Sequence, residues 1–129
     1  MSFAGQVEMP VACGRDFVRR ALARWHLPGP GPGAKPALLD DVLLVTAELL
    51  ANACLHGGGP RELALERRPG VLRVEVADAS AARPRRLTPA SGSPGGYGLL
   101  IVERLAARWG TTVRAGGKTV WAELATTGR

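Results

Sequence analysis

The chain has 129 residues, and its 17 basic and 11 acidic residues give a formal net charge of +6. This length fits one domain, residues 1–129, whose core forms without disulfides or structural metal. Cys13 and Cys54 lack the close spacing of a metal-binding pair, which argues against a zinc site and indicates a reducing cytoplasm. No apolar run reaches membrane-spanning length, and the N-terminus lacks the apolar core of a signal peptide. We therefore expect a cytoplasmic protein with no membrane contact.

The net positive charge favours partners rich in phosphate or carboxylate groups. Nucleotides, nucleic acids and acidic proteins all fit this description. Nucleic acid is the least favoured of the three, because only 5% of the residues are aromatic and no base-reading motif is present. We therefore expect no direct contact with nucleic acid.

The first half of the chain predicts two helices separated by a connector. Residues 2–8 fit a short edge strand, and residues 16–25 fit a helix with one apolar face. Residues 26–36 contain alternating proline and glycine, which a helix or a central strand does not accommodate, so they form a connector. Residues 37–56 fit a longer amphipathic helix with apolar positions at intervals of three and four. The glycines at 57–59 are a strong stop signal for it.

The second half predicts strands, a long loop and one further helix. Apolar and polar residues alternate on either side of Pro69-Gly70, which is typical of two strands joined by a turn. Residues 79–97 are rich in Ala, Pro, Ser, Gly and Arg without periodicity, and a loop of this length is more often functional than filler. The expected order is strands at 62–66 and 72–76, a helix at 99–108, and strands at 109–114 and 118–124.

The most informative feature is a polar stripe on the longer helix. Glu48, Asn52 and His56 are four residues apart, which places them on a common helix face. A carboxylate and a carboxamide then point the same way. The alternative is a solvated helix face, in which His56 suits the partial negative charge at the helix C-terminus.

Three further features follow in order along the chain. Asp78 ends a buried strand, where its oxygens can accept a hydrogen bond from a group such as an adenine amine, although a loop-capping aspartate is equally common. The glycines at 95, 96 and 98 stand before a helix, where backbone N–H groups bind phosphate or simply form a hinge. Lys118 and Thr119 begin the last strand, where a plain hairpin turn is the alternative.

In this order the motifs resemble those of the Bergerat-fold (GHKL) ATP-binding superfamily, and within it the small anti-sigma-factor serine kinases. Residues 48–56 are similar to the N box, Asp78 falls where the G1 box begins, residues 95–99 look like the G2 box, and residues 117–124 resemble the closing strand. The likeness covers roughly residues 36–124. It implies an α/β (α+β) two-layer sandwich, with helices packed on one face of a mixed, largely antiparallel sheet.

The resemblance also implies a role for each motif. Asn52 would give one oxygen to Mg²⁺, which otherwise keeps water and triphosphate oxygens, and Glu48 would accept the proton of an attacking hydroxyl. Residues 79–97 would form an ATP lid, with three arginines as candidates to touch phosphate or a partner, or to remain solvated. These arginines are Arg83, Arg85 and Arg86. The residues implied to bind ATP are Asn52, Asp78, Gly96, Gly98, Leu99 and Thr119, with Thr119 beside the base.

The implied function is that of an ATP- and Mg²⁺-dependent serine protein kinase. Its partner would be a small anti-sigma-factor antagonist, a sigma factor is a second candidate partner, and the resemblance favours a homodimer. The alternative is a non-catalytic nucleotide-binding or partner-binding regulatory module of the same fold. That alternative is favoured by the residues after Asp78, because the family has glycines where this chain has Ala79-Ser80-Ala81-Ala82.

Overall fold

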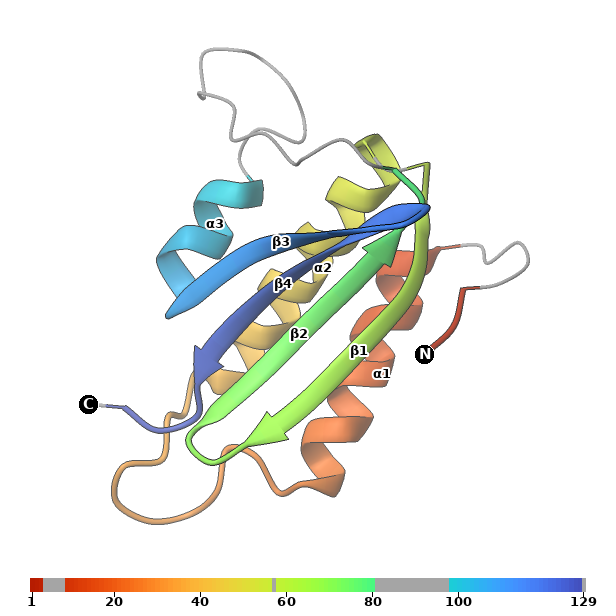
Figure 1. Cartoon of the computed structure of the whole chain (residues 1–129). Helices are drawn as coiled ribbons and strands as arrows, with labels where there is room; N and C mark the ends of the chain where they lie inside the picture. Colours follow the sequence, from red (N-terminus) through yellow and green to blue (C-terminus); the bar gives the residue numbers. More distant parts are fainter. Residues whose placement is uncertain (4–8, 57, 81–97, 129) are drawn as a thin grey trace.

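The computed structural model describes residues 1–3, 9–56, 58–80 and 98–128. Within these ranges the chain forms helices in its first half and mainly strands in its second (Figure 1). The elements in chain order are α1 (Pro10–Arg24), α2 (Leu38–His56), β1 (Pro60–Arg68), β2 (Val71–Asp78), α3 (Gly98–Leu105), β3 (Arg108–Arg114) and β4 (Gly117–Ala125).

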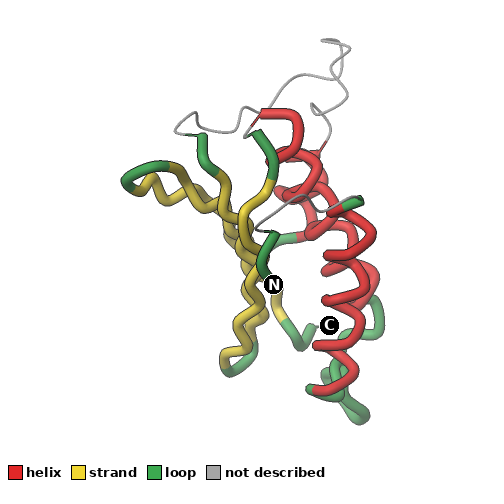
Figure 2. The backbone as a smooth tube through the Cα atoms, turned by 90° about the vertical axis from the view of Figure 1, so that its right-hand side faces the viewer, coloured by secondary structure: helices red, strands yellow, loops and turns green. Residues whose placement is uncertain are grey.

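The strands form one sheet in the order β1-β2-β4-β3, and every pairing among the described strands is antiparallel. Figure 2 shows the sheet edge-on, with the helices on one side of it only. The predicted α+β sandwich is therefore confirmed. The expected parallel component of a mixed sheet is not found among the described strands, because β4 enters between β2 and β3 in the opposite direction to both.

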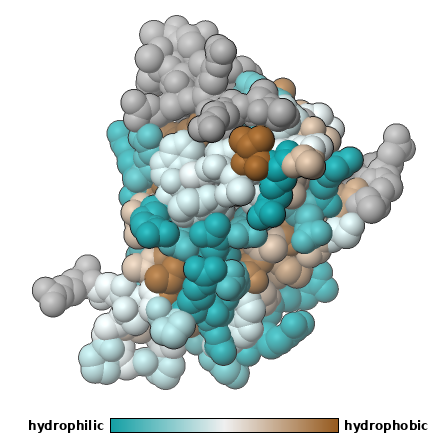
Figure 3. Space-filling model, in the orientation of Figure 1, coloured by the Kyte–Doolittle hydropathy of each residue, from teal (hydrophilic) through white to brown (hydrophobic). Residues whose placement is uncertain are grey.

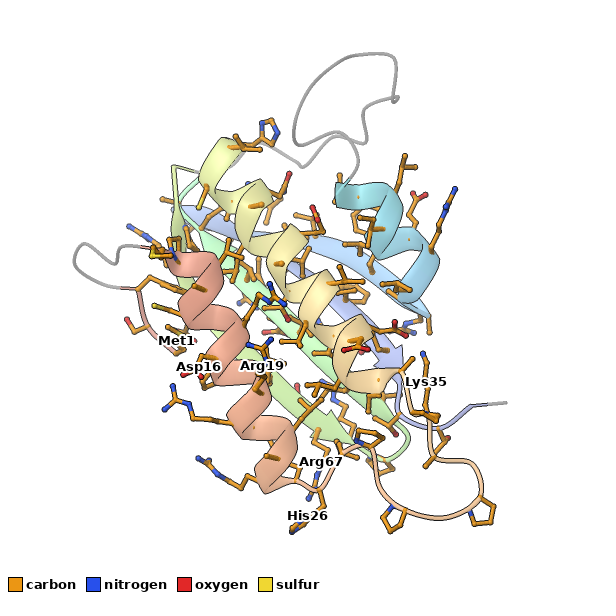
Figure 4. All side chains as sticks on the ribbon, turned by 180° about the vertical axis from the view of Figure 1, so that it is seen from behind. Met1, Asp16, Arg19, His26, Lys35 and Arg67 are labelled. Atoms are coloured by element: carbon orange, nitrogen blue, oxygen red, sulfur yellow. The ribbon has the colours of Figure 1, made fainter. Side chains whose placement is uncertain are left out.

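Helix α2 is the centre of the helical layer. It packs against α1, α3 and the sheet, and Figure 4 shows it between the other two helices. Its apolar positions face the strands, as the intervals of three and four require. A Cβ at Gly14 of α1 would overlap Leu50 Cδ1, so glycine allows the two helices to approach closely there. The core residues of α2 are Leu38, Val42, Leu43, Val45, Leu49, Leu50 and Ala53.

The end of α2 agrees with the glycine signal in the sequence. Gly58 has a positive φ of 74° and Gly59 one of 106°, a backbone region that glycine enters without steric cost. The N–H of Gly59 donates a hydrogen bond of 2.9 Å to the carbonyl of Ala53, which satisfies a carbonyl of the last helical turn. The helix predicted for residues 37–56 is thus confirmed as Leu38–His56.

Three predicted element boundaries are corrected. α1 begins at Pro10 rather than at residue 16, because Pro10 occupies the first helical position, where its fixed φ suits a helix start. α3 ends at Leu105 rather than at residue 108, since Arg108 already pairs with Glu123 in the sheet. Of the predicted strand 2–8, Ser2 forms an isolated bridge to Glu62, and residues 4–8 lie outside the described ranges.

The face of the sheet opposite the helices carries charged side chains around one tryptophan. The guanidinium of Arg73 lies 4.2 Å from the centre of the Trp121 ring, and Glu123 accepts a hydrogen bond of 3.0 Å from Arg73. An added Cβ at Gly110 would lie 2.8 Å from Trp121 Cζ2, so glycine leaves room for the indole. Hydrophilic residues accordingly cover much of this face in Figure 3.

Candidate functional site

The described parts of the four motifs found in the sequence lie at one end of the sandwich. Figure 1 shows the last turns of α2, the end of β2, the start of β4 and the start of α3 at this end. They come together because α2 and β2 both run towards it, whereas β4 and α3 both begin there. These segments, which are far apart in the sequence, therefore lie at the same end of the fold.

On α2, the structure distinguishes the three residues of the polar stripe. Asn52 is buried, with 5% of its surface exposed, and its Oδ1 has no hydrogen-bond partner among the described residues. Glu48, one turn earlier, is half-buried, and burial raises the pKa of its carboxyl group above the ordinary 4.5. His56 is exposed on the last turn, which agrees with a structural place at the helix C-terminus.

The unpaired Oδ1 of Asn52 fits the metal-binding role implied for it. A buried carbonyl oxygen without a hydrogen bond is unfavourable unless a ligand satisfies it. No group of three or more His, Cys, Asp or Glu side chains suited to a metal ion occurs in the described ranges. An ion held through Asn52 would therefore depend mainly on water and phosphate oxygens, which is how Mg²⁺ binds with nucleotides.

At the end of β2, Asp78 forms a buried ion pair with Lys118 of β4. Each side chain is only 1% exposed, and Lys118 Nζ lies 2.9 Å from Asp78 Oδ2. Nζ donates a hydrogen bond of 3.0 Å to Oδ1, which also accepts the backbone N–H of Ser80 at 2.8 Å. Oδ2 accepts no hydrogen bond in the described part of the chain. The predicted adenine acceptor is thus buried and ionically paired, with one oxygen left to accept a donor.

The antiparallel register brings these two charges together. Asp78 lies opposite Lys118, and alternate residues of β4 point to opposite faces of the sheet. Lys118 therefore shares the helix-covered face with Val120, Ala122 and Leu124, all of which are buried. A Cβ at the preceding Gly117 would overlap the carbonyl oxygen of Asp78, so glycine permits this close approach of the strands.

The sequence singled out Lys118 together with Thr119 but gave a binding role only to Thr119, and the structure places Lys118 beside Asp78. Thr119 follows Lys118 in a regular strand, so its side chain points to the face that carries Trp121. The structure therefore does not bring the Thr119 side chain to Asp78. The sequence does contain a sign of this position, because Lys118 falls on the same alternate positions of the last strand as its buried apolar residues. A lysine is rarely buried without a partner, so this pattern indicates a buried ion pair.

The remaining predicted residues belong to the loop before α3. Gly98 is the first residue of α3, and the side chain of Leu99 is buried, with 1% exposed. Leu99 therefore contributes its side chain to the interior. Gly96 and most of the predicted lid, including its three arginines, lie outside the described ranges. Those arginines are Arg83, Arg85 and Arg86.

Comparison with known proteins identifies the family. Residues 13–124 match the family described as the histidine kinase-like ATPase domain. The chain belongs to this family. The matched region contains α2, β2, α3 and all but the last residue of β4, so every motif of the candidate site lies within the histidine kinase-like ATPase domain.

A solved structure supports the same fold. The chain is similar to the histidine kinase domain of the blue-light activated histidine kinase from Erythrobacter litoralis EL346, with a TM-score of 0.52 and 23% sequence identity. The similarity covers 98% of this chain and 72% of that one. No curated protein sequence is significantly similar to this chain. Within the described ranges, no helix has the length and apolar character needed to cross a membrane.

Proposed function

We propose that this histidine kinase-like ATPase domain binds ATP with Mg²⁺ and transfers the γ-phosphoryl group to a serine of a small protein partner. One observation carries the proposal, namely the pairing of Glu48 and Asn52 on consecutive turns of α2. Asn52 presents a buried oxygen without a partner among the described residues, and Glu48 is a half-buried carboxylate with a raised pKa. The first group suits a metal bound to phosphate, and the second suits a general base.

The division of labour between the two side chains follows from their chemistry. The serine oxygen forms a bond to the γ-phosphorus as the bond from that phosphorus to the ADP oxygen breaks, and the serine proton moves to Glu48. Burial raises the pKa of Glu48 towards the working pH, which makes its carboxylate a stronger base than an exposed glutamate. Mg²⁺ held at Asn52 would neutralise charge on the triphosphate. The γ-phosphoryl group needs no covalent bond to the protein in this direct transfer.

The proposal includes the partners. The phosphorylated protein is a small anti-sigma-factor antagonist, a sigma factor is the second partner, and the active form is a homodimer. The support is the resemblance of the motif order to the anti-sigma-factor serine kinases, together with the net charge of +6, which favours acidic protein surfaces.

A second candidate function is a non-catalytic regulatory module of the same fold. It is favoured by the Asp78–Lys118 ion pair, because the carboxylate expected to bind adenine already has a buried counter-ion. In this version the domain binds a partner protein, with or without nucleotide, and no phosphoryl group is transferred.

Calorimetric titration with ATP, with and without Mg²⁺, tests the proposal. The wild type should bind ATP in the micromolar range only with Mg²⁺, and Asn52→Ala should bind more weakly. Asp40→Asn is a matched control, since Asp40 is exposed on the first turn of the same helix. Absence of binding at millimolar ATP would reject the nucleotide site in the isolated chain.

A second measurement separates the two candidate functions. Glu48→Gln should bind ATP like the wild type but lose phosphoryl transfer to a serine-containing antagonist by a factor of about 10²–10⁴. The non-catalytic module would be supported instead by two results together. The wild type would transfer no phosphoryl group, and Glu48→Gln would bind the partner protein as tightly as the wild type.

A further inference from the structure

We propose that an extended, acidic segment of a partner protein binds along the outer edge of β1, beside α1. The segment adds an antiparallel strand to the sheet, with an apolar side chain against Leu65 and a carboxylate against Arg67. This surface lies towards the opposite end of the sandwich from Asn52 and Asp78, because Asp78 pairs with Pro60 at the start of β1. Docking there goes beyond the proposed function and requires no nucleotide.

The first support is the backbone of β1 at Leu65 and Arg67. β1 is an edge strand, with β2 on one side only. Near its start, Leu63 donates a hydrogen bond of 2.9 Å to the Met1 carbonyl, and its own carbonyl accepts one of 2.8 Å from the Met1 nitrogen. Alternate residues of a strand point the same way, so the N–H and C=O groups of Leu65 and Arg67 also face outwards. No described residue outside the sheet bonds to them. Such an edge is a template for a further strand.

The second support is a hollow of about 200 Å³ beside this edge, between β1 and α1. Leu65 shares the helix-covered face of β1 with the buried Leu63. A side chain opposite Leu65 on an added strand would therefore point towards the hollow, which has room for one bulky apolar group. The hollow is lined by Phe17, Arg20, Ala21, Arg24, Trp25 and Leu65.

The third support is the charge around the hollow, which selects an acidic occupant. Arg20, Arg24 and Arg67 surround its aromatic side chains. Only Arg20 has an ionic partner in the described part of the chain, the exposed Asp16. The guanidinium of Arg67 lies 5.6 Å from the centre of the Trp25 ring, which holds it near the end of α1 (Figure 4). It follows the apolar position of β1 by two residues and so lies on the same face. The occupant thus carries a carboxylate two residues from its apolar side chain.

The same charges disfavour a second copy of this chain as the occupant. A symmetric dimer through this edge would bring the surface of both copies together, and Arg24 and Arg67 have no acidic partner among the described residues. Like charges across paired strands are destabilising. An acidic segment neutralises these arginines instead.

Titration with a synthetic peptide tests the proposal in the absence of nucleotide. The probe is an octapeptide with the repeat Thr-Phe-Thr-Glu, in which a phenylalanine and a glutamate alternate on one face of a strand. The wild type should bind it in the micromolar range. Replacing its glutamates by lysines should weaken binding about tenfold or more.

Backbone methylation of the peptide separates strand addition from simple charge attraction. Methylation of the phenylalanine and glutamate nitrogens removes the N–H groups that face β1, and it should weaken binding about tenfold or more. Methylation of the threonine nitrogens affects only N–H groups that point away from β1, and it should leave the affinity unchanged. Equal effects of the two methylations would overturn the proposal.

Variants and hydrogen exchange locate the bound peptide. Arg24→Ala/Arg67→Ala should bind it about tenfold or more weakly. The control Arg114→Ala changes an exposed arginine on β3, at the other edge of the sheet, and should bind like the wild type. The peptide should slow exchange of the Leu65 and Arg67 amides about tenfold or more and leave those of β3 unchanged.

Three results would overturn the proposal. They are absence of peptide binding, equal weakening in the two arginine variants, and unchanged exchange at Leu65 and Arg67. A dimer of the free chain that protects these two amides and does not dissociate with the peptide would also overturn it, in favour of a second copy. The titrations contain no nucleotide, so their outcome is independent of whether the chain binds ATP.

Discussion

Removing one charge of the Asp78–Lys118 pair should destabilise the domain far more than removing both. Each side chain is 1% exposed, and Nζ lies within 3.0 Å of both carboxylate oxygens. Lys118→Met therefore leaves a buried carboxylate without its counter-ion, and Asp78→Asn leaves a buried ammonium group. The double variant has no uncompensated charge and keeps an acceptor for the N–H of Ser80.

The magnitude follows from the burial of the pair. Breaking a fully buried ion pair from one side typically costs about 3–5 kcal/mol, whereas replacing both partners by neutral groups is often close to neutral. A chain of this size loses roughly 4 °C of Tm per kcal/mol. Each single variant should therefore melt about 10–20 °C below the wild type, and the double variant should recover most of that loss.

Urea unfolding followed by tryptophan fluorescence and far-ultraviolet circular dichroism measures the effect. Because the two single losses add up to about 6–10 kcal/mol and the double variant should lose only about 1 kcal/mol, the interaction energy of the double-mutant cycle should be roughly 5–9 kcal/mol. Coincident transitions for the two probes would justify a two-state treatment. Additive effects of the two single variants, within about 0.5 kcal/mol, would show that the charges do not interact in the folded protein.

Three further predictions concern α2 and the sheet. Burial raises the pKa of Glu48, so the folded state holds this proton more tightly than the unfolded chain, and stability falls as pH rises from about 4.5 through the folded-state pKa. Glu48→Gln should therefore be more stable than the wild type at pH 7 but not at pH 3. The midpoints of urea unfolding at the two pH values measure this difference. A gain in stability that is the same at both pH values would contradict the explanation by a raised pKa. Leu50→Ala removes a fully buried side chain and should cost about 2–5 kcal/mol in urea unfolding, and a cost below about 1 kcal/mol would contradict the described core. Gly110→Ala places a Cβ 2.8 Å from Trp121 Cζ2. The variant should lose about 1–3 kcal/mol of stability in urea unfolding, and its near-ultraviolet circular dichroism from tryptophan should change. An unchanged tryptophan signal would show that the indole does not lie over residue 110.

Local geometry explains which parts of the fold were predictable. The four-residue spacing of Glu48 and Asn52 places them on one helix face whatever the rest of the chain does, and α2 lies within one residue of its predicted bounds. Strand alternation similarly located β1 and β2. The start of α1 was missed because the helix begins six residues before the predicted start, where Met9 and Pro10 give no apolar periodicity.

The contents of the site were less predictable because they depend on distant parts of the chain. Asp78 and Lys118 are 40 residues apart, and only the pairing of β2 with β4 makes them neighbours. The choice of Thr119 rested on the chemistry of its hydroxyl group. A shift of one residue along a strand moves a side chain to the other face, and the register placed the lysine beside the carboxylate instead. The order of strands likewise follows from packing rather than from periodicity.

The position of β4 has a consequence for how the protein is made. This strand is the last in the described chain, yet it lies inside the sheet between β2 and β3. The ribosome synthesises the chain from its N-terminus. The strands β2 and β3 therefore leave the exit tunnel before β4, which pairs with both of them. Until residues 117–125 emerge, β2 presents an open edge that is prone to pair with other chains. During synthesis the incomplete sheet is therefore exposed to such pairing, and the Asp78 carboxylate gains its buried partner Lys118 only when β4 is added.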